Sequence, residues 1–124
     1  MREVLFKAKR LDGEWVEGSL IVYPDQTTEI VFDMGSIEEM GKAFVRPETI
    51  CQYTGMTDKN GKHIFEGDNV YDPHENSIYT VEWNEDNATF LMAHDWHRRS
   101  LETAYYCEVI GSIHDGEGDY VQRG

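Results

Sequence analysis

Residues 52–70 read QYTGMTDKNGKHIFEGDNV and place two turn signals between three short apolar runs. Asn60-Gly61 is the strongest hairpin signal in the chain, because a type I′ turn needs positive φ at both central positions. At a second corner, Gly67 offers an unusual backbone angle and Asp68 can accept hydrogen bonds from turn amides. The stretch therefore predicts a strand, a hairpin turn, a second strand, a sharp corner and a third strand.

On both sides of this stretch, apolar and polar residues alternate with a period of two, which is typical of strands with one buried face. We expect strands over residues 4–10, 14–23, 28–32, 50–54, 63–65, 69–71, 78–83, 89–93 and 105–113. Residues 36–41 form the best helix candidate, since Ser36 and Glu39 make a capping-box pattern and Gly41 can end the helix. Strands of this length and spacing predict a mainly β protein with a small barrel or sandwich.

The length of 124 residues fits either one domain or two very small ones. We predict an N-terminal β-rich subdomain over residues 1–60 and a second subdomain over 61–124, with the seam within residues 55–66. A single integrated domain is the alternative, because units of about 60 residues have thin cores and lean on each other or on neighbouring subunits.

The chain carries 24 acidic and 11 basic residues, a formal net charge of −13, and the excess lies mainly in its second half. Residues 63–124 hold thirteen Asp and Glu against three arginines. Affinity for nucleic acid comes largely from Lys and Arg, so direct binding of nucleic acid is not expected. An acidic surface of this kind favours solubility, a basic partner, or imitation of nucleic acid.

The sequence contains no signal for membrane insertion or export. Its longest apolar group, residues 19–23, is far shorter than the ~20 residues of a spanning helix. The first residues lack the apolar segment of a signal peptide. Cys51 and Cys107 lie in apolar, strand-like settings, which favours buried, reduced thiols over a disulfide or a nucleophile. We therefore expect a cytosolic protein.

Three pieces of the chain, in the right order, resemble the YopX family, small proteins of phages and prophages. The central piece is the quoted stretch, and its signature positions are Tyr53, Gly55, Asp58, Asn60, Gly61, Gly67 and Asp68. Residues 2–8 resemble the family's opening strand, and residues 108–114 its closing strand. Residues 90–102 match nothing in the family pattern, so the resemblance leaves that region unexplained.

The resemblance implies a YopX-like fold whose C-terminal half is a small SH3-like β-barrel. It also implies homo-oligomers, with hexamers among them, and a role in the cytosol of the host bacterium. It transfers no catalytic residue to this sequence. The signature residues are therefore interpreted as structural turns.

The segment HDWH, residues 94–97, is the most distinctive cluster in the unmatched region. Imidazoles and carboxylates are good ligands for zinc, so His94 and His97 are weak candidates for a metal site that His74 or His63 would complete. However, residues three apart point to opposite faces of a strand, whereas on a helical turn they could converge. The two arginines that follow also disfavour a bound cation.

Trp96, Arg98 and Arg99 form the candidate interaction site, because Trp and Arg are enriched at the energetic centres of interfaces. They fit a subunit contact or an acidic ligand. The alternative interpretation is a solvated loop with one buried tryptophan.

The sequence shows no catalytic constellation, phosphate loop or cofactor motif. We therefore predict a non-enzymatic phage or prophage accessory protein that acts as an oligomeric protein-interaction module on a host or phage protein. One alternative is an acidic mimic of nucleic acid or a single-strand-binding protein that uses exposed aromatics. The other is a metal-dependent hydrolase that uses His94 and His97.

Overall fold

The computed structural model describes residues 5–36 and 39–116, and its regular structure is almost entirely antiparallel β-strand. The described residues form two compact units. The first holds the residues up to Gln52 together with Gly116, and the second runs from Tyr53 to Asp115. The mainly β prediction is confirmed. No helix in the described part of the chain is long and apolar enough to cross a membrane.

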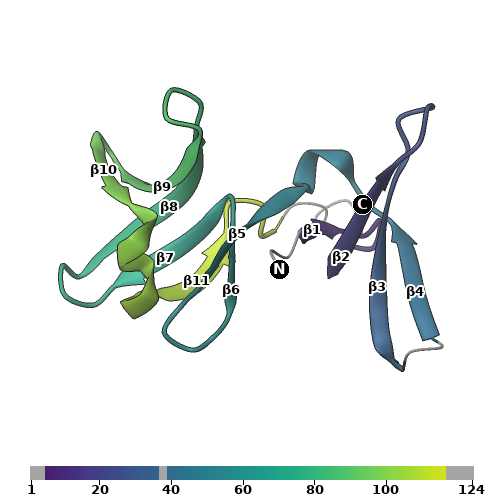
Figure 1. Cartoon of the computed structure of the whole chain (residues 1–124), viewed down its shortest axis with the longest axis horizontal. Coiled ribbons are helices and arrows are strands. Elements are labelled where there is room, and N and C mark those ends of the chain that lie inside the picture. Colours follow the sequence, from purple (N-terminus) through teal and green to yellow (C-terminus); the bar gives the residue numbers. More distant parts are fainter. Residues whose placement is uncertain (1–4, 37–38, 117–124) are drawn as a thin grey trace. The chain divides into compact units, whose positions relative to one another are not determined.

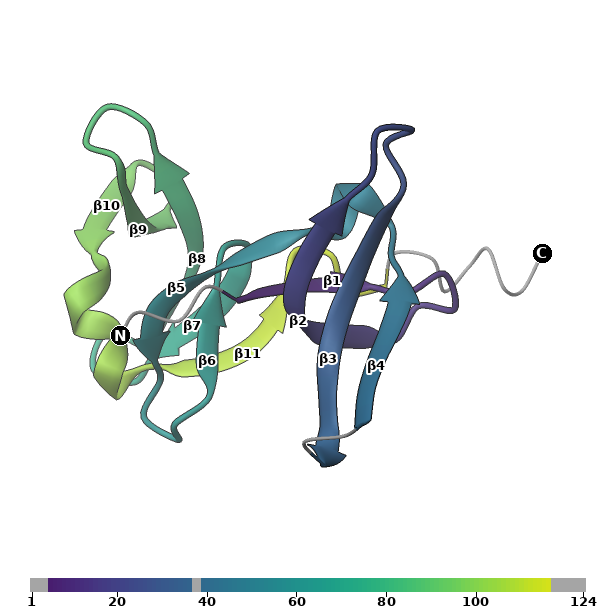
Figure 2. The same ribbon diagram turned by 45° about the vertical axis from the view of Figure 1, so that its right-hand side comes forward.

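The first unit is built on four strands that pair in chain order: β1 (Phe6–Lys9), β2 (Trp15–Val22), β3 (Thr28–Ser36) and β4 (Glu39–Phe44). Figures 1 and 2 both show β2, β3 and β4 side by side. A 3-10 turn, η1 (Pro47–Thr49), leads into β5 (Cys51–Thr57), whose first residues pair with β1. The core of this unit consists of Ala8, Ile30 and Val45, with Phe6, Val16, Leu20, Phe32 and Ile50 packed against them.

The second unit begins within β5, which pairs there with β6 (His63–Phe65). Four strands then follow one another as antiparallel neighbours: β7 (Asp68–Asp72), β8 (Ser77–Asn84), β9 (Thr89–His94) and β10 (His97–Ser100). A 3-10 helix, η2 (Leu101–Tyr106), precedes β11 (Glu108–Ser112), which returns beside β7 (Figures 1 and 2). The buried core comprises Ile64, Val70, Tyr79, Val81, Met92, Leu101, Ala104, Cys107 and Val109.

The five-stranded sheet of the second unit has the order β10-β9-β8-β7-β11. In the described residues, β10 and β11 lie at its two ends and do not pair with each other. The sheet is therefore not closed into the barrel that the family resemblance implied.

The helix predicted over residues 36–41 is wrong. Ser36 ends β3 and Glu39 begins β4, and the two residues pair across the hairpin. Gly41 lies within β4 opposite Phe32, whose ring occupies the space that a Cβ at Gly41 would need. Packing against a neighbouring strand outweighs a short capping signal, which is worth little without a helix long enough to bury a face. Residues 37 and 38 lie outside the described residues.

The end of the second unit also differs from the prediction. Tyr105 and Tyr106 lie in η2 and not in a strand, and the preceding strand β10 was not predicted. The Ser100 hydroxyl caps η2 by accepting a hydrogen bond from the Glu102 amide at 3.2 Å. Ala104 is fully buried in the middle of this helix. Such a capped turn buries one residue in three or four, which hides the period-two signal of a strand.

Candidate functional site

The side chain of Asp58 organises the hairpin of the family-like signature. It is only 4% exposed, and its Oδ1 accepts hydrogen bonds from the amides of Asn60 (2.8 Å) and Lys62 (2.9 Å). Its Oδ2 accepts a third bond from the Val109 amide in β11, at 2.8 Å. One carboxylate therefore shapes the turn and attaches it to a strand 51 residues further along the chain.

The hairpin at Asn60-Gly61 is present, but its turn is not type I′. Gly61 has a φ of +78°, whereas Asn60 is not among the residues with positive φ. The Gly61 amide donates to the Asp58 carbonyl at 3.0 Å, and the Asp58 amide donates to the Lys62 carbonyl at 2.9 Å. This pattern belongs to a hairpin loop that is longer than two residues and contains one glycine in the left-handed conformation. It leaves two loop amides for the Asp58 carboxylate to bind.

Gly67 and Asp68 form the second corner of the signature. Gly67 has a φ of +85°, its amide donates to the Val81 carbonyl at 2.7 Å, and its carbonyl accepts from the Ile113 amide at 2.9 Å. The fully buried Asp68 carboxylate accepts a hydrogen bond from the Phe65 amide at 2.8 Å. The corner thus connects three parts of the second unit through its backbone.

The remaining signature positions lie on β5. The Tyr53 ring packs against the rings of His63 and Phe65, with centroid distances of 4.6 and 5.6 Å. Gly55 has a φ of +91° in the irregular stretch of pairing between Tyr53 and Thr57. All seven signature positions therefore serve turns, bulges and strand packing.

The β9–β10 hairpin carries the candidate metal ligands. Asp95, with a φ of +51°, and Trp96 form its two-residue turn, which makes His94 and His97 cross-strand partners. The sequence analysis considered both histidines on one strand or on one helical turn, and it did not consider them on opposite strands of a hairpin. A two-residue hairpin places residues three apart directly opposite each other, with their side chains on the same face.

Neither of the two other histidines predicted to assist completes a metal site. In the described residues, no group of three or more His, Cys, Asp and Glu side chains is placed to hold a metal ion. His94 Nδ1 lies 3.0 Å from the Ile78 carbonyl, and His74 packs edge-on against Tyr106. His63 lies against Tyr53.

Arg99 is bound by groups of its own unit. Its Nη1 donates to Asp72 Oδ2 at 2.5 Å and to Glu75 Oε1 at 2.8 Å, and its Nη2 donates to the Tyr106 hydroxyl at 2.6 Å. Its guanidinium carbon lies 5.0 Å from the centroid of the Tyr79 ring. Asp72 is fully buried, so this arginine neutralises a carboxylate that has no contact with water.

Arg98 and Trp96 are more exposed to solvent than Arg99 is. Arg98 Nε is 3.0 Å from Glu82 Oε1, and both side chains are roughly half exposed. Trp96 is 84% exposed and stacks on the His97 ring at a centroid distance of 6.1 Å. The interpretation of Trp96 as a buried anchor of a solvated loop is therefore wrong.

The first unit presents an exposed apolar face that the sequence interpretation missed. Ile21, Glu29 and Phe44 are neighbours across β2, β3 and β4, so their side chains share one face of the sheet. Tyr23 follows Ile21 by two residues, and its hydroxyl donates a hydrogen bond to the Glu29 carboxylate. We call Ile21, Tyr23, Glu29 and Phe44 the outer face.

The outer face combines exposed rings with one covered carboxylate. Ile21, Tyr23 and Phe44 are 38%, 37% and 53% exposed, whereas Glu29 is 5% exposed. The signal in the sequence was the apolar run of residues 20–23, which interrupts strict alternation. A strand that is apolar on both faces needs a second surface to cover it.

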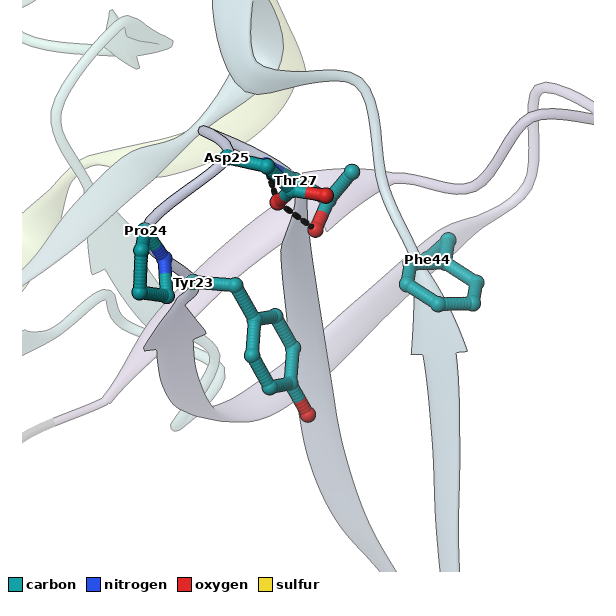
Figure 3. A pocket seen from close by; sticks show the side chains of 5 residues that line it. All are labelled: Tyr23, Pro24, Asp25, Thr27 and Phe44. Carbon is teal, nitrogen blue, oxygen red and sulfur yellow. Dashed lines mark hydrogen bonds between the residues drawn. The ribbon is translucent and has the colours of Figure 1, made fainter.

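A pocket of about 380 Å³ lies at one end of the outer face, lined by Tyr23, Pro24, Asp25, Thr27 and Phe44. Figure 3 shows the rings of Tyr23 and Phe44 standing apart, with the Asp25–Thr27 loop above them. The Asp25 carboxylate accepts hydrogen bonds from the Thr27 amide (3.0 Å) and hydroxyl (2.6 Å). This turn holds the rim of the pocket in place.

The model of the YopX protein family matches residues 6–117. The chain belongs to the YopX family. The match includes residues 90–102, which the sequence resemblance had left unexplained, so the β9–β10 hairpin belongs to the family region. A search of curated proteins found no match to the chain.

Two buried carboxyl groups of this YopX protein, Asp72 and Asp58, have lowered pKa values in the folded state. Burial by itself raises the pKa of Asp72, but hydrogen bonds from Arg99 and from the His74 and Glu75 amides lower the pKa by more than burial raises it. Burial likewise raises the pKa of Asp58, and the three amides that it binds outweigh this effect. Both carboxyl groups therefore have a pKa below the ordinary value.

These two pKa shifts predict that the YopX protein loses stability in acid. A lowered pKa in the folded state stabilises the fold above the unfolded pKa of about 4, and this contribution disappears as the pH falls through the folded pKa. We expect the free energy of unfolding, measured with urea, to be nearly constant from about pH 7 to 5 and to fall below about pH 4. Asp58→Asn removes one of the two groups, so its stability should decline less steeply. An equal decline in the variant would contradict the role assigned to Asp58.

Proposed function

We propose that this YopX protein is a non-enzymatic accessory protein of a phage or prophage. It works as an oligomer in the cytosol of the host bacterium and binds a host or phage protein. Membership of the family supports the phage-type origin. The observation that carries the oligomer is the outer face, where exposed aromatic and aliphatic side chains surround a pocket (Figure 3).

The occupant of the outer face is a second copy of the chain. Residues 53–115 contain twelve Asp and Glu against four Lys and Arg, a net charge of −8, so second units repel one another. The outer face instead offers apolar side chains, and Tyr23 covers the one carboxylate among them. Two copies therefore meet with the least electrostatic repulsion when they contact each other through their first units.

The strand arrangement supports the same contact. β4 ends the strand order of its sheet, and no other described strand pairs with its outer edge. An exposed edge of this kind can pair with the same edge of another copy around a twofold axis. Such dimers can be the building units of a hexamer.

The second unit is an SH3-like module. Its last strand, β11, returns beside its first sheet strand, β7, after a 3-10 helix. A small five-stranded barrel needs this strand order before its two end strands can pair and close it. Small β modules of this type commonly present loops to partners while the sheet holds the loops rigid.

Replacing Phe44 with lysine is expected to weaken self-association by at least about tenfold in Kd, about 1.4 kcal/mol, because an aromatic anchor is lost and a charge is placed against an apolar surface. Light scattering coupled to size-exclusion chromatography measures the mass across a dilution series. Ile113→Lys, at a similarly exposed apolar residue of the second unit (56%), is the matched control and should keep the wild-type mass. A wild-type chain that stays monomeric at high concentration would refute the proposal.

A further inference from the structure

A second pocket lies in the second unit, where β8 and the β9–β10 hairpin meet the turn between β7 and β8. Its volume is about 240 Å³, and it is lined by Glu75, Ser77, Tyr79, His94, Asp95, Trp96 and His97. Pockets for drug-sized molecules measure roughly 300–1,000 Å³. This pocket therefore has room for one long side chain of a partner and not for a larger ligand.

The charges around the pocket are unbalanced towards negative. Glu75 and Asp95 line the pocket, and Arg99 and Asp72 lie next to Glu75, so three carboxylates stand against one arginine. Arg99 already pairs with Asp72 and with Oε1 of Glu75, and Oε2 of Glu75 accepts a hydrogen bond from the Tyr79 hydroxyl. Asp95 is 68% exposed, and His94 Nε2 lies 3.7 Å from its Oδ2, beyond hydrogen-bonding distance. An anionic ligand would therefore meet repulsion, and a cationic one attraction.

The walls of the pocket are suited to a flat cation. The Trp96 ring is 84% exposed at the tip of the hairpin and rests on the His97 ring with an angle of 28° between the planes. Immediately beside the pocket, the guanidinium of Arg99 already lies over Tyr79 and donates to Glu75. The molecule thus shows, with its own arginine, that aromatic and carboxylate groups here hold a guanidinium.

We infer that this pocket binds the guanidinium of an arginine in a basic segment of a partner protein. Trp96 stacks on the guanidinium plane, and the Asp95 carboxylate accepts its N–H groups. The overall charge of −8 on residues 53–115 attracts such a segment from a distance. Arginine suits the pocket better than lysine, because only its planar group can stack and donate in two directions at once.

The test is an NMR titration of the full chain with the peptide acetyl-Gly-Arg-Gly-amide and with its neutral citrulline counterpart. We expect the arginine peptide to shift the amides of the residues lining the pocket and the Trp96 indole, and the citrulline peptide to bind at least about fivefold more weakly. Trp96→Ala and Asp95→Asn should each weaken binding about two- to fivefold. Asparagine tolerates the left-handed backbone at position 95, so the hairpin is kept.

Trp83→Ala is the matched control, because Trp83 is a 43% exposed tryptophan of the same unit that packs on Phe90 outside the pocket. Its binding of the arginine peptide should equal that of the wild type. Equal affinity for the two peptides, no binding of either, or unchanged binding by both pocket variants would overturn the inference. Phe44→Lys changes the first unit only, so this variant should bind the arginine peptide as tightly as the wild type does. A failure of the proposed self-association can therefore be distinguished from a failure of the proposed pocket.

Discussion

Asp58→Ala is expected to destabilise the second unit by about 3–5 kcal/mol. The substitution removes the acceptor of three backbone amides, and one of them, that of Val109, is buried between strands. A buried donor left without a partner costs about 1–3 kcal/mol by itself. Urea unfolding gives the total change, and native-state hydrogen exchange at the amides of Val81 and Met92 localises it to the second unit, since both residues are buried in its core.

Two variants serve as controls for this effect. Asp58→Asn keeps one acceptor oxygen and loses the other, so its stability should lie between those of the wild type and Asp58→Ala. Asp25→Ala removes a similar turn-forming aspartate that is exposed in the first unit, and it should cost less than Asp58→Ala. A loss below about 1 kcal/mol for Asp58→Ala would show that water or a shifted loop replaces the carboxylate.

Arg99→Met should also destabilise the second unit, by about 3–5 kcal/mol, because it leaves the fully buried Asp72 carboxylate without its cation. The His74 and Glu75 amides remain bound to Asp72, so the loss comes from the missing cation. The measurement is again the free energy of unfolding in urea, at neutral pH.

The double variant Asp72→Asn/Arg99→Met tests the cause of this loss. Removing the buried charge together with its partner should recover a substantial part of the lost stability. Arg98→Met is the matched control, since Arg98 pairs with Glu82 at the surface, and its cost should stay within about 1 kcal/mol. Equal losses at the two arginines would show that burial of Asp72 does not determine the effect.

The strands were largely predictable, because their signals are local. Alternation located most of the strands, and the glycine turns located the corners around residues 60 and 67. The prediction failed where a local signal competed with packing. Ser36 and Glu39 resemble a helix start in sequence, but strand pairing turns them into the ends of a hairpin. Residues 97–106 carry no clear period, and both β10 and η2 were missed there.

The candidate sites were less predictable than the fold. The sequence singled out Trp96, Arg98 and Arg99 as one cluster, but it could not show that each arginine has carboxylate partners. Those partners come from β7, β8 and the turn between them, and only the strand register brings them within reach. The outer face of the first unit was missed because residues 20–23 were interpreted as the end of the strand over residues 14–23 without considering which face each residue occupies.

The local sequence determines the turns within residues 52–70, because a glycine with positive φ or an aspartate facing turn amides depends on its immediate neighbours. That chemistry was sufficient to identify the mainly β fold and the family. The distant partner of Asp58 and the charge balance around Trp96 depend on groups that are far away in the chain. Only the tertiary structure brings those groups together, and our proposal of a cationic ligand at the β9–β10 hairpin rests on that arrangement.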